Sequence, residues 1–181
     1  MSISPSQKGS FQLKKIAIIG PECTGKTELA EALAKHFRTE WVPEYARTFI
    51  DHLNTPYGEG DLLKIAKGQL DWEDKYAGMA NEYLICDTNL IVIKIWSDHK
   101  YGHTDPWILE SLQTRSYDFY LLTDIDIPWQ PDPQREHPHM RQYFFDLYQN
   151  YLIRQAHPFA VVHGMGDERV KQAIKLVEER G

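Results

Sequence analysis

The chain has 181 residues, of which 42% are hydrophobic and 25% charged, and its formal net charge is −6. This length suits one domain with a full core rather than two, and the acidic balance argues against a general nucleic-acid binder or a membrane-surface binder. No apolar run approaches the length that spans a bilayer, and the two cysteines do not suggest a disulfide framework, so we expect a cytoplasmic protein.

Residues 1–13 are polar and contain no apolar segment of the kind that a signal peptide needs. We therefore expect a flexible N-terminal tail, followed by a single domain over residues 14–181.

The first predicted strand, residues 14–19, is apolar after its two lysines and leads into a glycine-rich loop that fits G-x-x-x-x-G-K-[ST]. A helix follows, with apolar residues recurring at helical spacing up to Phe37. In such a loop the glycines let the backbone approach phosphate, and the amide groups face the anion. The other interpretation, a glycine-rich turn with an incidental lysine, does not explain the flanking strand and helix. The residues that we expect to bind the phosphates of ATP are Gly20, Pro21, Glu22, Cys23, Thr24, Gly25, Lys26 and Thr27.

Further along the chain, residues 39–42 form a short strand candidate that ends at Pro43, and a helix is expected around residues 48–53. Residues 54–60 have the composition of a loop. Asp61 is the expected cap of a longer helix that runs to about residue 81.

The second half of the chain continues the alternation of strands and helices. Strands are expected at 83–87, 117–122 and 159–162, and helices from residue 88 to about 99, over 144–152, and over 167–177 with Asp167 as cap. This order predicts a three-layer α/β fold with a central parallel sheet, as in P-loop nucleoside and nucleotide kinases. Ligands bind such sheets at the carboxyl ends of the strands, which brings the glycine-rich loop, Glu44, Asp87 and the loop after residue 122 together.

Two carboxylates follow predicted strands and are candidates for chemistry. Asp87 ends a buried strand, where an acid in this class of enzyme holds Mg²⁺ together with the hydroxyl of Thr27; its other interpretation is a cap for the next helix. Glu44 can orient an acceptor hydroxyl and accept its proton; its other interpretation is a surface ion pair with Arg47 one helical turn away.

The stretch from about 123 to 140 is long and contains four prolines, which is typical of a lid or binding loop. Arg135 lies inside it and Arg141 just beyond it, and arginines on a closing lid can stabilise charge on a transferring phosphoryl group. The alternative is a stiff connector with solvated charges.

Histidines occur in close pairs, but none of these pairs has a cysteine or acid at convincing ligand spacing, so we do not expect a zinc site. The residues concerned are His99, His103, His137 and His139.

From about residue 14 onward the chain resembles the nicotinamide riboside kinase domain of the NadR-like family of P-loop kinases. The matching pieces are the loop at 20–27, VPEYAR at 42–47, CDTN at 86–89, YDFYLL at 117–122, DIPW at 126–129, Arg135 and Arg141.

This resemblance implies an enzyme that uses ATP and Mg²⁺ to phosphorylate the ribose 5′-hydroxyl of nicotinamide riboside, with Glu44 as base and Asp87 as metal ligand. Lys26, Arg135 and Arg141 complete the expected catalytic set. Glu44, Tyr45, Arg47 and Asn89 are the expected substrate contacts.

The chain departs from the family in two places. Asn89 stands where many relatives carry an acid, and Pro43 stands where some relatives carry an aromatic residue against the nicotinamide ring. If the ring is stacked, Trp41, Tyr45, Trp72 or Tyr76 must therefore supply the face. The DNA-binding and adenylyltransferase domains of full-length regulators have no counterpart in this sequence, so we expect neither activity.

Two other functions remain open at this stage: a regulatory ATPase whose output is a partner contact, and a nucleoside kinase for a different base. A homo-oligomer is compatible with either.

Overall fold

Five parallel strands form the centre of the structure, a computed structural model that describes residues 12–181. Their order across the sheet is β2-β3-β1-β4-β5. Most of the segment expected to be a flexible tail lies outside the described residues. The strands are β1 (Lys14–Ile19), β2 (Trp41–Val42), β3 (Tyr83–Asp87), β4 (Phe119–Thr123) and β5 (Phe159–Val162).

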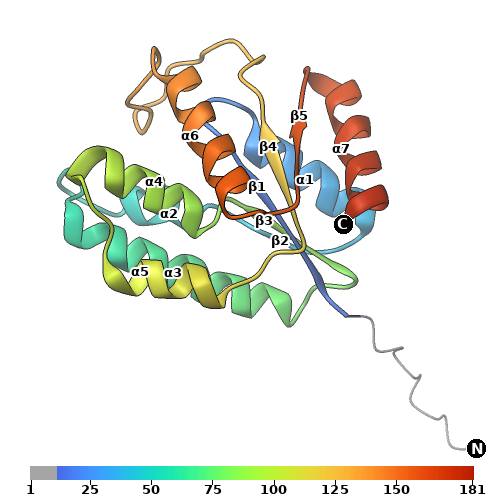
Figure 1. Ribbon diagram of the computed structural model, residues 1–181, viewed down its shortest axis with the longest axis horizontal. Coiled ribbons are helices and arrows are strands. Elements are labelled where there is room, and N and C mark those ends of the chain that lie inside the picture. Colours follow the sequence, from blue (N-terminus) through green and yellow to red (C-terminus); the bar gives the residue numbers. More distant parts are fainter. Residues whose placement is uncertain (1–11) are drawn as a thin grey trace, which may run out of the picture.

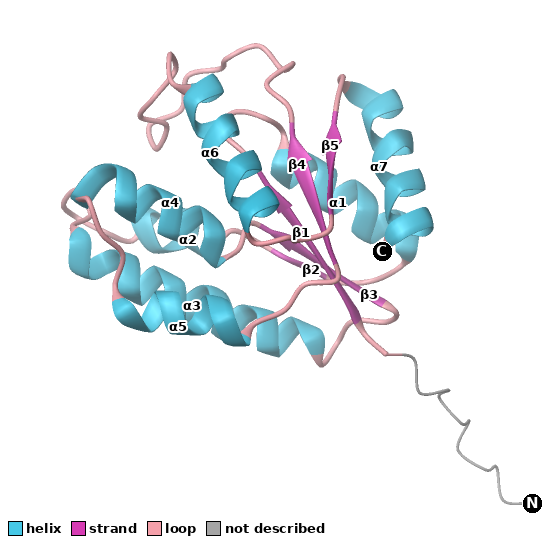
Figure 2. Cartoon of the chain, in the orientation of Figure 1, coloured by secondary structure: helices cyan, strands magenta, loops and turns pink. Residues whose placement is uncertain are grey.

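Helices cover both faces of this sheet (Figures 1 and 2). Side chains alternate between the two faces of a strand, so Ile16 and Ile18 of β1 pack with α1 and α7, whereas Ala17 and Ile19 pack with α4 and α6. The result is the three-layer arrangement that the sequence predicts. The helices are α1 (Lys26–Phe37), α2 (Tyr45–Asp51), α3 (Glu59–Ala77), α4 (Leu90–Tyr101), α5 (Pro106–Thr114), α6 (Arg141–Arg154) and α7 (Gly166–Arg180). None of these helices is both long and apolar enough to cross a membrane.

A further apolar cluster joins α2, α3, α4 and α5 away from the sheet. Leu62 and Ile65 of α3 meet Leu90 and Ile93 of α4 in it, together with Ile108 of α5. This cluster fixes the helices that follow β2 and β3, and therefore the walls of the space at the carboxyl end of those strands.

Helix α5 is absent from the sequence prediction. Asp105 caps it by accepting a hydrogen bond from the backbone N–H of Trp107 at 2.8 Å, and Pro106 occupies its first turn. The Asp-Pro pair followed by apolar residues at helical spacing was the signal available.

Several predicted element ends differ from the structure. Strand β2 is only two residues long, because the N–H of Thr39 still bonds the Ala34 carbonyl at the end of α1. Helix α3 begins at Glu59, and Asp61 lies inside its first turn, where its carboxylate accepts the N–H of Gly58 at 2.9 Å. Helices α2 and α6 begin about three residues earlier than predicted, and α3 ends at residue 77.

The predicted cap of the last helix is wrong. Helix α7 begins at Gly166, so Asp167 lies in its first turn, and the residue at the cap position is Met165, which makes no side-chain cap bond. A carboxylate in the first turn still interacts favourably with the helix dipole.

Gly68 permits the contact between α2 and α3. A Cβ built on Gly68 would lie 2.1 Å from Cε1 of Tyr45, so the ring fills the space that a side chain would need. We expect Gly68→Ala to lower the free energy of unfolding by about 1–3 kcal/mol, despite the better helix propensity of alanine.

The matched control is Gly60→Ala in the same helix, where an added Cβ would meet nothing within 4 Å. We expect it to leave stability unchanged or raise it by up to about 1 kcal/mol. Urea denaturation of both variants measures the difference, and equal stabilities would show that the Tyr45 ring does not depend on Gly68.

Candidate active site

The carboxyl ends of four parallel strands place the candidate residues at one edge of the sheet. The glycine-rich loop joins β1 to α1, Glu44 follows β2 and immediately precedes α2, and Asp87 and Thr123 end β3 and β4. Ile18 of β1 pairs with Asp87 of β3, so the ends of these two strands lie side by side.

The loop at residues 20–27 is tightly wrapped. Gly20 has φ +150°, and a Cβ there would lie 2.2 Å from Oγ1 of Thr123, so only glycine fits. The hydroxyl groups of Thr24 and Thr123 are hydrogen-bonded at 2.7 Å, and Thr24 also donates to the Pro21 carbonyl at 2.8 Å. The loop is thus anchored to β4 as well as to β1.

Lys26 lies over this loop at the start of α1. Its ammonium group donates to the carbonyl oxygens of Gly20 at 3.1 Å and Pro21 at 2.9 Å. A lysine held here, beside the N-terminal amides of a 12-residue helix, concentrates positive charge in a way that suits an anion such as phosphate.

The side-chain oxygens of Thr27 and Asp87 lie together at the edge of the sheet. The Thr27 hydroxyl donates to Oδ2 of Asp87 at 2.6 Å, while Oδ1 of Asp87 is buried and has no hydrogen-bond partner among the described residues. Hydroxyl and carboxylate oxygens are the donors that Mg²⁺ prefers, so these residues fit the predicted metal.

The pKa of Asp87 is raised to about 6, first by burial and next by the negative charge of Glu44. Lys26, the Thr27 hydrogen bond and Arg47 oppose this shift. A divalent cation at the free oxygen would favour the ionised carboxylate.

The sequence left two interpretations of Glu44 open, a surface ion pair with Arg47 and a role in the site, and the structure is compatible with both. Its Oε2 lies 3.5 Å from Nε of Arg47, which confirms the ion pair one turn along α2. Arg47 also reaches Asp132 at 3.3 Å, in the long loop after β4. At the same time Glu44 and Arg47 line a cavity that extends from the glycine-rich loop, so the ion pair does not exclude a role in the cavity.

That cavity has both a polar and an aromatic lining. Gly20, Glu22, Cys23 and Lys26 line it on the side of the glycine-rich loop. The other lining residues comprise seven polar or charged ones and nine apolar or aromatic ones: Glu44, Arg47, Gln69, Thr88, Gln134, Arg135, Glu136, Ala46, Ile50, Leu62, Ile65, Val92, Ile93, Tyr57, Trp96 and Tyr148.

None of the four aromatic residues considered for ring stacking lines this cavity. Tyr45 instead packs against Gly68 and meets Trp72 edge-on, with ring centroids 4.9 Å apart. Trp41 and Tyr76 pack against the apolar clusters of the two sheet faces. Tyr45 therefore differs from its predicted role as a substrate contact, because Gly68 admits its ring into the contact between α2 and α3.

Tyr57, Trp96 and Tyr148 supply the aromatic wall, and sequence reasoning missed all three. They lie on a loop, α4 and α6, far apart in the chain. The Trp96 ring stacks with those of His137 and Phe144, with centroids 5.3 Å and 5.2 Å away. No motif marked these positions, because an aromatic residue in an apolar helix has the pattern of a core residue.

Asn89 caps α4, and Asp87 does not. The side-chain oxygen of Asn89 accepts the N–H of Ile91 at 3.0 Å, and the residue is fully buried and absent from the cavity lining. Asn89 therefore has a structural role as a cap, its predicted substrate contact stays a prediction, and Asp87 is left to face Thr27.

Residues 124–140, between β4 and α6, are tied down over the cavity. The Glu22 carboxylate in the glycine-rich loop accepts backbone N–H groups of Glu136 at 3.1 Å and His137 at 3.2 Å. The Glu136 side chain accepts the Tyr57 hydroxyl at 2.9 Å and lies 3.5 Å from Nζ of Lys100.

The two arginines of this region have different surroundings. Arg135 lines the cavity, donates to the Gln130 carbonyl and lies over the Trp129 ring. Arg141 is the first residue of α6 and donates to the carbonyl oxygens of Ile127 at 2.7 Å and Cys23 at 3.2 Å. Arg141 therefore joins the long loop to the glycine-rich loop.

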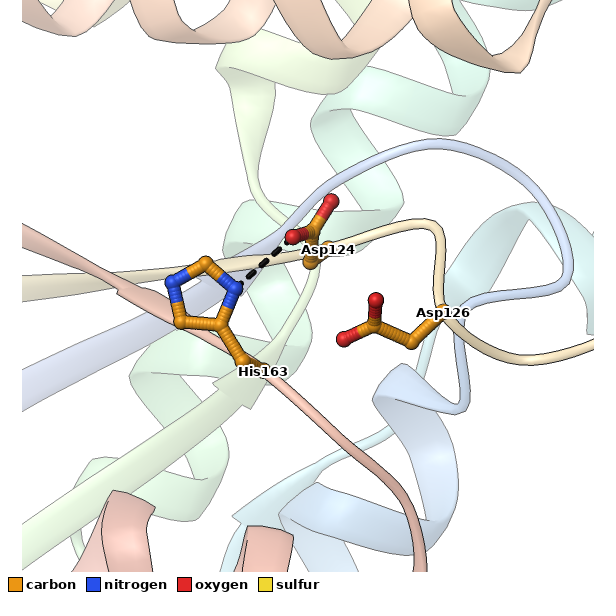
Figure 3. Close-up of side chains that lie close together, drawn as sticks. All are labelled: Asp124, Asp126 and His163. Atoms are coloured by element: carbon orange, nitrogen blue, oxygen red, sulfur yellow. Dashed lines mark hydrogen bonds and ion pairs between the residues drawn. The ribbon is translucent and has the colours of Figure 1, made fainter.

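Asp124, Asp126 and His163 cluster beside this edge, beyond β4 and β5 (Figure 3). Nδ1 of His163 lies 2.7 Å from Asp124, and the N–H of Gly164 bonds Asp126 at 2.5 Å. The nearby guanidinium of Arg169 is buried and already supplies a positive charge. Because these groups have partners within the protein, we assign no cation to the cluster.

Comparison with known proteins relates this geometry to a family. A family model described as an AAA domain matches residues 15–169. The trifunctional NAD biosynthesis/regulator proteins NadR of Escherichia coli and Salmonella typhimurium are each 26% identical over 137 residues, which are 72% of this chain and 33% of theirs. The chain thus spans about a third of the length of these curated relatives. The resemblance to NadR that the motifs predict is confirmed.

Solved structures confirm the predicted fold class. NadR protein in complex with NR superposes with a TM-score of 0.78 at 21% identity, covering 92% of this chain and 50% of that one. NadR protein in complex with NAD and AMP-PNP has a TM-score of 0.77 at 20% identity, with coverages of 92% and 49%. Thymidylate kinase from Ehrlichia chaffeensis has a TM-score of 0.61 at 14% identity, covering 91% of this chain and 98% of that one.

The raised pKa of Asp87 predicts how Mg²⁺ binding depends on pH. A proton competes with the cation for the carboxylate below a pKa of about 6, so we expect apparent Mg²⁺ affinity to fall as pH drops from 7.5 to 5 and to level off above 7. Titration of Mg²⁺ in the presence of an ATP analogue measures this.

Two variants distinguish the effect of the Asp87 carboxylate on Mg²⁺ binding from the effect of the Glu44 charge on the pKa of Asp87. Asp87→Asn should bind Mg²⁺ weakly at every pH, whereas Glu44→Gln should move the midpoint to lower pH, because the Glu44 charge contributes to the shift. Affinity that does not change between pH 5 and 7.5 in the unmodified protein would contradict the assignment of Asp87 as ligand.

Proposed function

The chain belongs to the AAA-domain family whose model covers residues 15–169, and on that premise we propose that it is an ATP-dependent kinase of a nucleoside, specifically nicotinamide riboside. One observation carries the proposal: a single cavity joins the glycine-rich loop with its lysine to a carboxylate at the neighbouring strand end and to an aromatic wall. That combination suits the transfer of a phosphoryl group to an alcohol on a molecule with a flat ring.

The nucleotide end of the site would use Lys26 and the amide groups of residues 20–27 to hold the phosphates of ATP. Thr27 and Asp87 would hold Mg²⁺, which supplies charge neutralisation at the β- and γ-phosphates when it is bound. The 2.6 Å hydrogen bond between them already places the two ligand oxygens together.

Glu44 would orient the acceptor hydroxyl and accept its proton as the phosphoryl group transfers. Arg47 supports this role, because its guanidinium lies 3.5 Å from the carboxylate and helps to hold it in place. Asp87, hydrogen-bonded to Thr27 and absent from the cavity lining, is better suited to the metal than to the acceptor proton.

Residues 123–140 would act as the lid. The loop contributes Gln134, Arg135 and Glu136 to the cavity wall, so its movement would open or close the site. We assign Arg135 to the transferring group, because it is the arginine of this loop that lines the cavity. Its Nε is buried and has no partner among the described residues, so it has a donor to offer.

The acceptor end favours a flat, positively charged ring. Trp96 and Tyr148 line it, and burial raises the pKa of the Tyr148 hydroxyl, which therefore stays a neutral donor. Glu22, Glu44 and Glu136 add negative charge to the same cavity. Aromatic faces with acids around them suit the cationic nicotinamide ring, in agreement with the resemblance to NadR and with the solved complex of that protein with NR.

A nucleoside kinase for another base is the second candidate. The similarity to deoxyadenosine kinase from M. mycoides, with a TM-score of 0.56 at 14% identity, supports the fold of such an enzyme. A regulatory ATPase would use the same nucleotide end, and only an acceptor-dependent phosphorylated product separates it from a kinase.

We expect ATP-dependent phosphorylation of nicotinamide riboside, with kcat/KM higher than for uridine, cytidine, deoxynucleosides or thiamine under the same conditions. Lys26→Ala should abolish transfer with little effect on the fold, and Glu44→Gln should lose most of kcat, because each removes a group from the reacting end of the cavity. Glu31→Gln, on the exposed face of α1, is the control.

Product formation measured by chromatography decides between the candidates. A competing substrate that exceeds nicotinamide riboside by about tenfold in kcat/KM, or 1.4 kcal/mol, would refute the choice of acceptor but leave the kinase. ATP consumption without any phosphorylated acceptor would refute the kinase.

Arg135→Ala should lower kcat by about ten- to a thousandfold, the range for losing one donor to the transition state, with little change in thermal stability. Arg141→Ala should also lower kcat, but through the loop that it anchors, so we expect a measurable drop in Tm as well. Steady-state kinetics and thermal denaturation of both variants test this, and unchanged kcat in Arg135→Ala would favour the connector interpretation.

A further inference from the structure

Three consecutive residues at the carboxyl end of β3 each have a buried polar atom without a hydrogen-bond partner among the described residues. The atoms are Oδ1 of Asp87, Oγ1 of Thr88 and Nδ2 of Asn89. Asp87 has a proposed metal to bind, and Asn89 has a function as the cap of α4. Thr88 has neither, and of the three it is the residue that lines the cavity.

Leaving the Thr88 hydroxyl unpaired is costly. The residue is 2% exposed, and a buried hydroxyl without a partner loses its hydrogen bonds to water. Because Thr88 lines the cavity, a molecule bound there is the candidate partner for this hydroxyl.

The backbone of Thr88 adds a second cost. Its φ is +78°, a conformation that β-branched residues rarely adopt and that glycine adopts freely. The flanking structure imposes this geometry: the N–H of Thr88 bonds the Ile18 carbonyl at 3.0 Å, and Asn89 begins the cap of α4 immediately after it. Thr88 thus combines a strained backbone conformation with a hydroxyl that makes no hydrogen bond among the described residues. This pattern is typical of a residue that serves a ligand.

We propose that Oγ1 of Thr88 hydrogen-bonds a secondary ribose hydroxyl of the acceptor and makes the site selective for ribonucleosides over deoxyribonucleosides. This inference rests on the proposed function, because it requires an alcohol acceptor in the cavity. Glu44 is assigned to the reacting hydroxyl, so Thr88 serves a second hydroxyl on the same molecule. A threonine hydroxyl both donates and accepts, which matches an alcohol and distinguishes it from the lysine and arginines of the phosphate end.

Selectivity follows from the burial of this group. When an acceptor lacks the matching hydroxyl, Oγ1 stays unpaired inside the closed site, and the loss is larger than that of one exposed contact. The contact is formed on binding, so it should change KM and the dissociation constant more than kcat.

The experiment compares the unmodified protein with Thr88→Val and Thr88→Ser on nicotinamide riboside and its 2′-deoxy and 3′-deoxy analogues. Thr88→Val keeps the shape and removes the hydroxyl, so we expect about a tenfold or greater rise in KM for the riboside. The same variant should show no such rise for the analogue that lacks the contacted hydroxyl. Thr88→Ser should stay within about threefold of the unmodified protein.

The Tm of Thr88→Val, measured without acceptor, distinguishes a ligand-binding role of the hydroxyl from a structural one. Removing an unpaired buried hydroxyl should leave the Tm of Thr88→Val unchanged or higher, whereas loss of a structural hydrogen bond would lower it. If Thr88→Val does not fold, Thr88→Gly adopts the same φ without strain and supplies a second variant without the hydroxyl.

The proposed function and the role of Thr88 can be refuted separately. An unmodified protein that phosphorylates no nucleoside overturns the proposed function. Turnover in the unmodified protein, with Thr88→Val showing the same ratio of riboside to deoxy analogues, overturns the Thr88 assignment alone.

Discussion

The parallel pairing of β1 with both β3 and β4 is the constraint on which the rest of the site depends. It places the end of β1 between Asp87 on one side and Thr123 on the other. Thr123 then fits against Gly20 and Thr24, and Asp87 meets Thr27 at the start of α1. A sheet with one antiparallel neighbour at this position would send one of these groups to the opposite edge, and the glycine-rich loop, Asp87 and Thr123 would not meet.

Because the strand ends meet at one edge of the sheet, charged side chains are concentrated there. Burial raises the pKa of Asp87, and the negative charge of Glu44 raises it further. Lys26 and Arg47 oppose part of this shift. The remaining unpaired oxygen of Asp87 means that the compensation is incomplete within the described residues, and a bound cation would complete it.

The sequence predicts the parts of the site that depend on local order along the chain. The glycine-rich loop, Glu44 and Asp87 each directly follow a strand, so a parallel sheet brings them to one edge whatever the details of packing. The aromatic wall depends on how helices are rotated against one another, and Trp96 and Tyr148 therefore could not be distinguished from core residues. The position of Tyr45 could not be predicted for a related reason. Its ring packs against α3 because Gly68, 23 positions further along the chain, leaves space for it.

The loop over the cavity combines stiffness with weak anchors. Four prolines restrict its backbone, which lowers the entropy lost on ordering it. Its ties to the body, from Glu22 to the amides of Glu136 and His137, and from Asp132 to Arg47, lie at partly exposed positions where such bonds contribute little each. In the proposed lid role two of these anchors matter most, because Glu22 and Arg47 themselves line the cavity. A ligand bound beside them would change the ties that hold the loop. Binding in the cavity would then be coupled to the position of the loop through these two side chains.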